Sequence, residues 1–414
     1  MGITLTEGQQ TAYEDFAKFI LSDDQTVFVL EGYSGTGKTT LVERILEFVP
    51  KLLEDYKTAH PTNPITWEIA LTATTNKAAE AFSHITGEEV RTIHSTLGLR
   101  VHKDFKTGIT SLKFRGNAES VFNTILFIDE ASYIDKALLS LIFEGTEDCK
   151  IVFIGDPAQL LTVGCTKSPV FGQGFPTAKL TEVVRQAKGN PIIELATEFR
   201  NTVNTGDFFS FVPDGVHIQV LDRDTFEAEI IKEFDDPTWV HNRSKVLAWT
   251  NKTVIQYNHA IRDVVKGAPD FIDGDYAICN SYVAHKKGGI KTDQLVCITD
   301  IEDGVSKEGV PGRLYTLDHE YSFFMPINIE DKKALQKQAK AASNYKLLSM
   351  IDGWIDLRAA YACTINKAQG STYDKVFIDL DDIKKCNSGN QIARMLYVGV
   401  SRARLIVYLC GDLI

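Results

Sequence analysis

Eight residues, from Gly32 to Thr39, have the types and spacing of a phosphate-binding loop. They read Gly-Tyr-Ser-Gly-Thr-Gly-Lys-Thr and follow an apolar run that predicts a strand. Glycines let backbone N–H groups point inward, and a following helix N-terminus adds positive potential. We expect Lys38 to neutralise the β- and γ-phosphates and the Thr39 hydroxyl to bind Mg²⁺. The alternative is a glycine-rich turn without a ligand. The predicted nucleotide-binding residues of this loop are Gly35, Thr36, Gly37, Lys38, Thr39 and Thr40.

Two adjacent acids, Asp129 and Glu130, end the apolar run at 125–130. We expect them at the carboxyl edge of a strand neighbouring the phosphate loop, where further metal ligands must come from. Asp129 is then the Mg²⁺ partner, acting through water. Glu130 is placed to orient or deprotonate an attacking water. Plain solvation of a strand end is the alternative.

The expected nucleotide is ATP. Guanine-selective proteins with such a loop present Asn-Lys-x-Asp after a later strand, and the Asp reads the base. Asn-Lys pairs occur at 76–77, 251–252 and 366–367, and the residues at the Asp position are Ala79, Val254 and Gln369. None of them supplies the carboxylate.

Apolar runs rich in Val, Ile and Phe must position these groups. They occupy 25–32, 68–75, 123–130 and 150–157, and helix-like segments follow them. Such alternation is typical of a parallel sheet covered on both faces. It returns at 245–250, 375–380 and 404–410. The sequence therefore predicts an α/β fold with two parallel sheets and a cleft between them.

Three segments depart from this alternation. Residues 97–115 alternate polar with apolar side chains around Thr107 and Gly108, which predicts a small exposed hairpin. Residues 276–329 hold short β-like runs and predict a β insertion. The Lys-rich stretch 330–347 is helix-prone and indicates a solvated helix face.

Size and composition bound the class of protein. With 414 residues, 44% of them hydrophobic, the chain exceeds one ordinary core and predicts two to four domains. Its seven cysteines are scattered without zinc spacing, which favours a reducing, cytosolic compartment. No apolar run reaches the roughly 18 residues of a membrane span. Met1, Gly2 and Thr6 fit the loose myristoylation pattern, but nothing basic follows, so we expect no membrane anchoring.

The net charge of −11 argues against nonspecific attraction to nucleic acid. A groove with a local basic lining and stacking groups can still hold a single strand while the outer surface stays acidic. A nucleic-acid partner therefore has to be argued from motifs.

Ten segments in order resemble the successive motifs of superfamily 1B helicases, the branch that includes RecD and the Dda-type helicases of T-even bacteriophages. The segments are 5–9, 32–40, 72–79, 92–95, 127–132, 155–160, 180–186, 248–252, 364–372 and 396–404. The resemblance implies two RecA-like parallel-sheet domains with a β-hairpin (pin) insertion and a small SH3-like β insertion. The implied bounds are 1–95 plus 118–184 for domain 1A, 96–117 for the pin 1B, 185–275 plus 355–414 for domain 2A, and 276–354 for the accessory domain 2B.

The resemblance also assigns four roles around the nucleotide. Gln9 is similar to the family's adenine-reading glutamine, whose amide both donates and accepts. Gln159 resembles the γ-phosphate sensor. Arg185 and Arg402 resemble the two arginines that reach the γ-phosphate, the second from across the cleft.

The DNA-facing residues are likewise carried over by motif. They are Thr75, Asn76, Lys77, Thr92, His94, Thr364 and Asn366. Relatives carry His where Asn76 and Asn366 stand, so these two contacts are weaker or simply hydrogen-bonded. A satisfied core histidine is the alternative for His94. Phe105, near the hairpin turn, is the candidate wedge that stacks on the first broken base pair, or else it packs the hairpin onto its domain.

The implied activity is that of a monomeric, ATP- and Mg²⁺-dependent DNA helicase that translocates 5′ to 3′ on single-stranded DNA and unwinds forked duplex DNA. A phage origin and action in the host cytoplasm also follow from the resemblance. A single-strand-binding protein or another replication protein is a candidate partner. One alternative is a RecD-like translocase that needs partner subunits. Another is an ATP-switched binding module.

Overall fold

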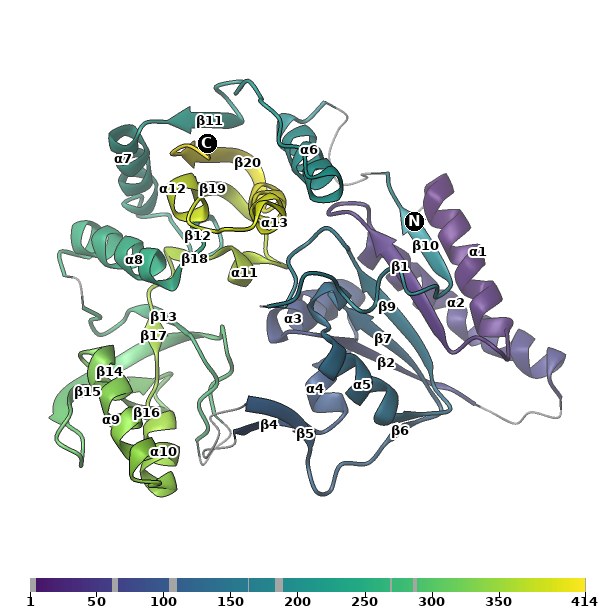
Figure 1. Cartoon of the computed structure of the whole chain (residues 1–414), viewed down its shortest axis with the longest axis horizontal. Coiled ribbons are helices and arrows are strands. Elements are labelled where there is room, and N and C mark those ends of the chain that lie inside the picture. Colours follow the sequence, from purple (N-terminus) through teal and green to yellow (C-terminus); the bar gives the residue numbers. More distant parts are fainter. Residues whose placement is uncertain are drawn as a thin grey trace. The chain divides into compact units, whose positions relative to one another are not determined.

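The computed structural model describes residues 5–61, 66–103, 110–162, 164–182, 189–268, 270–285 and 289–413 (Figure 1). These residues form two compact units. The first contains the described residues up to His102 and from Ser111 to Phe208, and the second contains Lys103, Thr110 and the described residues from Phe209 onward. The finer division into four domains stays a prediction. Within the described ranges, no helix combines the length and apolarity needed to cross a membrane.

A six-stranded sheet forms the centre of the first unit, and all its strand pairs are parallel. Its order is β10-β1-β9-β7-β2-β3. The strands are β1 (Val27–Gly32), β2 (Glu68–Ala73), β3 (Val90–Thr92), β7 (Thr124–Asp129), β9 (Lys150–Gly155) and β10 (Thr177–Leu180). The sequence placed Asp129 on a strand neighbouring the phosphate loop, and this was wrong in detail, because β9 lies between β1 and β7.

Helices cover both faces of this sheet, as the apolar runs predict (Figure 1). They are α1 (Glu7–Leu21), α2 (Lys38–Ala59), α3 (Asn76–Thr86), α4 (Ile93–Thr96) and α5 (Lys136–Glu144), with a 3-10 turn at Ala131–Tyr133. The unit also contains α6 (Pro191–Thr205). Alternate residues of β1 serve different cores. Phe28 packs with α1 and α2, whereas Val29 lies in the core that includes α5. The central strands β1, β7 and β9 are therefore buried on both sides, so their functional side chains can emerge only at their ends.

Two small strand pairs accompany the sheet. Strands β4 (Leu99–Lys103) and β5 (Thr110–Phe114) pair with each other at the position of the predicted hairpin. Strands β6 (Val121–Phe122) and β8 (Thr146–Glu147) form a short parallel pair. Phe105, the candidate wedge, lies outside the described residues.

The second unit holds a five-stranded parallel sheet in the order β11-β20-β19-β12-β18. Its strands are β11 (Ile218–Leu221), β12 (Ser244–Ala248), β18 (Ala362–Thr364), β19 (Tyr373–Asp379) and β20 (Ala403–Cys410). Its helices are α7 (Arg223–Phe234), α8 (Asn251–Lys266), α11 (Ile365–Ala368), α12 (Leu380–Ile383) and α13 (Gly389–Val400). The predicted α/β class with two parallel sheets is confirmed.

A smaller antiparallel sheet belongs to the same unit and has its own apolar core. Its order is β16-β15-β14-β13-β17. The strands are β13 (Tyr276–Cys279), β14 (Leu295–Val305), β15 (Pro311–Leu317), β16 (Tyr321–Pro326) and β17 (Leu357–Arg358), with helices α9 (Ile329–Ala341) and α10 (Tyr345–Asp352) before β17. Only Ala339 of α9 is buried, so the Lys-rich helix is largely solvated, as predicted.

Candidate functional site

The glycine loop joins the end of β1 to the start of α2, and two of its glycines fix its shape. A Cβ atom on Gly32 would lie 2.7 Å from Thr36 Oγ1 and 2.8 Å from Lys38 Cγ, so no side chain fits there without displacement. Gly37, which precedes α2, has a φ of +75°, a left-handed conformation that favours glycine. The loop is therefore a tight backbone cradle that only this glycine spacing can form.

Lys38 is the first residue of α2, and its side chain folds back over the loop. Its Nζ donates to the carbonyl oxygens of Gly32 at 2.6 Å and Tyr33 at 3.0 Å. Thr39 and Thr40 follow in the first helical turn, which contains no acidic residue. A positive charge and a helix N-terminus thus meet at the cradle, which is the arrangement that attracts phosphate.

Gln9 connects the start of α1 to the same loop. Its Nε2 donates to the carbonyl oxygen of Thr36 at 3.2 Å, and its Oε1 accepts from the Thr6 backbone N–H at 3.0 Å. The side chain is 3% exposed and borders a pocket of about 290 Å³ that Leu180 and Glu182 also line. An amide offers two donors and two acceptor lone pairs, so one of each remains for a ligand in this pocket.

Asp129 and Glu130 lie where β7 ends, and their backbone is unusual. Glu130 adopts a left-handed conformation, with φ +55° and ψ +44°, that non-glycine residues rarely take. Its backbone N–H donates to Asp129 Oδ1 at 2.8 Å, and its carbonyl oxygen accepts from Thr74 Oγ1 and from the Tyr133 N–H, each at 3.1 Å. Strain of this kind is found where the surrounding structure fixes a functional side chain.

Asp129 is a buried carboxyl beside a second acid, so a bound cation would stabilise its charged form. Burial and the neighbouring charge of Glu130 raise the pKa of Asp129 to about 7, while the charge of Lys38 lowers it. The carboxylate is therefore close enough to the loop to respond to Lys38. Mg²⁺ prefers oxygen ligands, and the Thr39 hydroxyl and Asp129 carboxylate supply them from the two sides of the site. The donor set fits this ion together with a nucleotide.

Gln159 belongs to the loop after β9, between the glycine loop and the acid pair in the order of the sheet. The loop is fixed by Asp156, which is fully buried and accepts from the Ala158 backbone N–H at 3.0 Å. The Gln159 N–H donates to the Asp156 carbonyl oxygen at 3.1 Å, and its side chain is 5% exposed. Because β9 lies between β1 and β7, this side chain starts from the middle of the edge that carries the other candidates.

Three threonines that the sequence assigned to DNA share one local geometry. Each ends a parallel strand or follows it within two residues, and each caps the next helix. Thr75 accepts from Ala78 N–H, Thr92 from Ser95 N–H, and Thr364 from Lys367 N–H, at 3.1, 3.2 and 3.3 Å respectively. Asn76 and Lys77 begin α3, and His94 and Asn366 lie in the short helices α4 and α11. Helix N-termini at a sheet edge present backbone N–H groups that can contact nucleic-acid phosphates.

His94 is partly buried. Burial lowers its pKa, and the negative charge of Asp135 opposes this shift. The imidazole is therefore neutral at pH 7, which removes a charged contact with phosphate but leaves a hydrogen bond. Both the DNA-facing and the structural interpretation of His94 stay predictions.

Of the two candidate arginines, the structure describes Arg402. Arg185 lies outside the described residues. Arg402 is 6% exposed, and its guanidinium donates to the carbonyl oxygens of Val398 and Ser371, each at 3.1 Å, and to Ser401 Oγ at 2.8 Å. Arg402 is thus fixed against the end of α13 and the segment that follows α11.

Comparison with known families agrees with this geometry. The family described as "AAA domain" matches residues 4–220, which is more than half of the chain and includes the glycine loop and the acid pair. The chain belongs to this family. A second family, described as "UvrD-like helicase C-terminal domain", matches residues 359–410, which include Thr364, Asn366 and Arg402.

Individual relatives extend the likeness beyond the AAA domain. The ATP-dependent DNA helicase dda of Enterobacteria phage T4 is 28% identical over 458 aligned positions, covering 98% of this chain and 98% of the relative. The ATP-dependent RecD2 DNA helicase of Deinococcus radiodurans is 32% identical over 171 positions, 41% of this chain and 21% of the relative. The crystal structure of Pif1 helicase from Bacteroides in complex with ADP-AlF3 and ssDNA has the same fold, with a TM-score of 0.51 at 18% identity, covering 100% of this chain and 94% of that one. The predicted resemblance to superfamily 1B helicases is confirmed.

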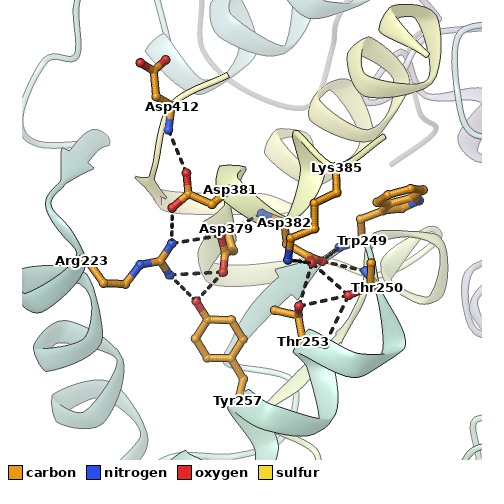
Figure 2. Close-up of polar contacts among 10 residues, drawn as sticks. All are labelled: Arg223, Trp249, Thr250, Thr253, Tyr257, Asp379, Asp381, Asp382, Lys385 and Asp412. Atoms are coloured by element: carbon orange, nitrogen blue, oxygen red, sulfur yellow. Dashed lines mark hydrogen bonds and ion pairs between the residues drawn. The ribbon is translucent and has the colours of Figure 1, made fainter. Parts of the chain in front are cut away.

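Outside the AAA domain, the structure reveals a polar cluster that sequence reasoning missed. Asp382 lies in α12, the short helix that follows β19 (Figure 2), and is 1% exposed. Its Oδ2 accepts from the backbone N–H groups of Trp249 and Thr250 at 2.8 and 2.7 Å. Its Oδ1 accepts from Thr253 Oγ1 at 2.7 Å and Lys385 Nζ at 2.9 Å. Burial opposes the charge, but these hydrogen bonds outweigh it and lower the pKa of Asp382.

This cluster fixes a fourth strand–threonine–helix junction. Thr250 follows β12 and caps α8, accepting from Thr253 N–H at 3.3 Å, as Thr75 caps α3 in the AAA domain. Beside it, Arg223 contacts Asp379 at 3.2 Å and Asp381 at 2.6 Å (Figure 2). One sequence signal could have found this junction, because Thr-Asn-Lys occurs at both 75–77 and 250–252.

We expect Asp382→Ala to lower the free energy of unfolding by about 3 kcal/mol. The change leaves buried N–H and hydroxyl donors and a lysine without their acceptor. Urea denaturation followed by circular dichroism measures the loss. Asp381→Ala is the control: Asp381 is 53% exposed, so its removal should cost at most about 1 kcal/mol. Equal effects of the two substitutions would contradict the role given to Asp382.

Proposed function

We propose that this protein is an ATP-dependent DNA helicase that translocates 5′ to 3′ on single-stranded DNA and unwinds forked duplex DNA. One observation carries the proposal. The same chain holds a glycine cradle with an acid pair at one parallel-sheet edge, and threonine-capped helix N-termini at the edges of both parallel sheets. The likeness to the phage T4 helicase over 98% of both chains supports it. The 5′-to-3′ direction is the one that the resemblance to superfamily 1B helicases implies.

In the proposed hydrolysis step, the chain's own residues bind the phosphates, orient the attacking water and accept its proton. Gly35, Thr36 and Gly37 surround the phosphates with backbone N–H groups, and Lys38 balances their charge. Glu130 accepts the proton of the attacking water, and its left-handed backbone sets the position from which the side chain starts. Thr39 and Asp129 would hold Mg²⁺, which would supply positive charge against the phosphate oxygens. Gln159 senses the γ-phosphate, and Gln9 reads the base.

The arginines complete the proposed nucleotide site. Arg185 and Arg402 stabilise the transferred phosphoryl group, because guanidinium is permanently charged and binds phosphate oxygens bidentately. The contacts of Arg402 to Ser371 and Ser401 fix its starting position. ATP binding and product release then change the grip of one RecA-like domain relative to the other.

The proposed DNA track consists of capped helix N-termini rather than a basic face. Thr75, Thr92 and Thr364 mark three of these ends, and Asn76 and Asn366 add side-chain hydrogen bonds. Backbone N–H groups attract phosphate without formal charge, which is compatible with a net charge of −11. Phe105 is proposed as the wedge; a Phe105→Ala variant that unwinds as fast as the parent would remove it from this role.

We further propose that the protein works as a monomer in the cytoplasm of a phage host, with a single-strand-binding or other replication protein as partner. Its four-part organisation follows the bounds predicted from the sequence. Sedimentation of the protein on a forked substrate tests the first point, since a dimer stoichiometry is incompatible with it.

The deciding experiment measures ATPase rate with and without single-stranded DNA, followed by unwinding of forks of opposite polarity. We expect strong stimulation by DNA and unwinding only of forks with a 5′ single-stranded tail. A RecD-like translocase would show stimulation without unwinding until a partner is added. An ATP-switched binding module would show turnover that ignores DNA.

A further inference from the structure

Lys367 lies in the proposed DNA-facing helix α11, between Asn366 and Gln369, yet its side chain is engaged inside the protein. Its Nζ donates to the carbonyl oxygen of Asn280 at 3.2 Å, to Asn280 Oδ1 at 2.7 Å and to Asp293 Oδ1 at 2.7 Å. An ammonium group has three N–H donors, and these three acceptors match them. A lysine in such a motif would ordinarily be expected to bind a DNA phosphate through its charge. Here the ammonium group binds acceptors of the protein instead.

Both acceptor residues belong to the small antiparallel sheet. Asn280 directly follows β13, and Asp293 lies just before β14, so they flank the base of the connection between these strands. The Asp293 N–H donates to the Cys279 carbonyl oxygen at 2.8 Å, which closes that base. Asp293 has a φ of +62°, a left-handed conformation that Asp and Asn adopt more readily than most residues. The backbone is thus fixed where its carboxylate meets Lys367.

The contacts continue to a second helix of the same unit. Asn280 Nδ2 donates to Asp356 Oδ2 at 2.7 Å, and Asp356 pairs with Arg358 at 3.2 Å. Arg358 Nη1 donates to Asn251 Oδ1 at 2.8 Å, and Asn251 is the first residue of α8. The small sheet therefore touches the starts of both α8 and α11, the two helices that begin at the carboxyl ends of the adjacent strands β12 and β18.

We propose that Lys367 is a positioning residue that ties α11 to Asp293 and Asn280 of the small antiparallel sheet and does not itself bind DNA phosphate. The tie holds Thr364 and Asn366 in the orientation in which they meet the DNA backbone. Lys367 and Asp293 are each 27% exposed, so salt screens this pair less than an exposed one. The inference rests on the proposed function, because it takes α11 to face single-stranded DNA.

The test uses the full-length protein, a fluorescent oligo-dT strand and anisotropy titrations over a range of salt concentrations. The variants are Lys367→Met, Asp293→Asn and the double substitution. Asparagine also tolerates the left-handed backbone, so Asp293→Asn removes the charge alone. We expect each single variant to weaken binding by a similar factor of about 5 to 20, and the double variant to bind no more weakly than either, as coupled residues do. The slope of log affinity against log salt should stay unchanged in all three.

A direct phosphate contact predicts a different pattern. Lys367→Met would then reduce that slope by about 0.7, the value for one contact to a single strand. Asp293→Asn, which frees the ammonium, would leave binding unchanged or tighten it. Either result overturns the proposal.

Asp303→Asn is the matched control, because Asp303 lies in the same sheet, is 83% exposed and pairs with Arg313 away from α11. We expect the Asp303→Asn variant to bind DNA as the parent does.

ATPase assays separate this proposal from the proposed function. Lys367→Met and Asp293→Asn should raise the DNA concentration for half-maximal stimulation about 5- to 20-fold, with the DNA-free rate and the rate at saturating DNA unchanged. A fall in the saturating rate without a shift in that concentration would contradict a positioning role. If the unsubstituted protein shows no DNA stimulation, the proposed function fails. If it is stimulated and only the variant pattern differs, the positioning role alone fails.

Discussion

Lys38→Ala is expected to reduce ATP hydrolysis by about 1,000-fold or more and to weaken nucleotide binding. The ammonium faces the glycine loop through the carbonyl oxygens of Gly32 and Tyr33, so its removal takes the one fixed cation from the start of α2. Preorganised charge of this kind stabilises the transition state far more than a mobile charge in water does. DNA-stimulated phosphate release, measured at saturating ATP, checks the prediction.

The fold should survive this substitution, because the hydrogen bonds of Lys38 Nζ go to carbonyl oxygens of the glycine loop itself and not to the core. Circular dichroism and the melting temperature should match those of the parent. Lys57→Ala is the control, since Lys57 lies in the last turn of the same helix and is exposed. Retained DNA-stimulated hydrolysis in Lys38→Ala would show that the nucleotide site has been placed wrongly.

Glu130→Gln should leave ATP binding within about threefold of the parent while lowering kcat by about 100- to 10,000-fold, the usual contribution of a general base. The amide keeps the length of the side chain and the held backbone, but it cannot accept the proton of water. Single-turnover hydrolysis and a separate nucleotide-binding titration distinguish the two effects.

The two substitutions should therefore differ in kind. Lys38→Ala damages both binding and chemistry, whereas Glu130→Gln damages chemistry alone. Glu144→Gln, at the exposed end of α5, is the control for the loss of one carboxylate. A decrease in kcat of less than about threefold in Glu130→Gln would mean that this acid merely solvates the end of β7.

The local parts of the site could be predicted from the sequence. The glycine spacing of 32–39 and the apolar run at 125–130 depend on neighbouring residues, because loop shape and strand burial are local properties. The order of strands across the sheet is not local. Nothing near Asp129 indicates that β9 comes between β7 and β1, so the sequence placed this acid one strand too close to the loop.

The hydrogen bonds of Asp382 and Lys367 could not be predicted from the sequence either, because they join residues far apart in the chain. Asp382 binds a backbone N–H 133 positions away in the chain, and Lys367 pairs with a carboxylate 74 positions away. Asp382 stands in an acidic run that a sequence reader takes for a solvated turn, and Lys367 resembles a phosphate ligand. Only the folded chain shows that both side chains hold other segments in place.

The connection between the small antiparallel sheet and its parallel neighbour limits how the second unit can move. Strands β17 and β18 are separated only by Ala359, Ala360 and Tyr361, all buried. Side chains also join the two sheets, because Lys367 of α11 pairs with Asp293 and Arg358 of β17 donates to Asn251 of α8. The two sheets should therefore travel as one rigid arm, and dyes attached to each should report a constant separation throughout the nucleotide cycle.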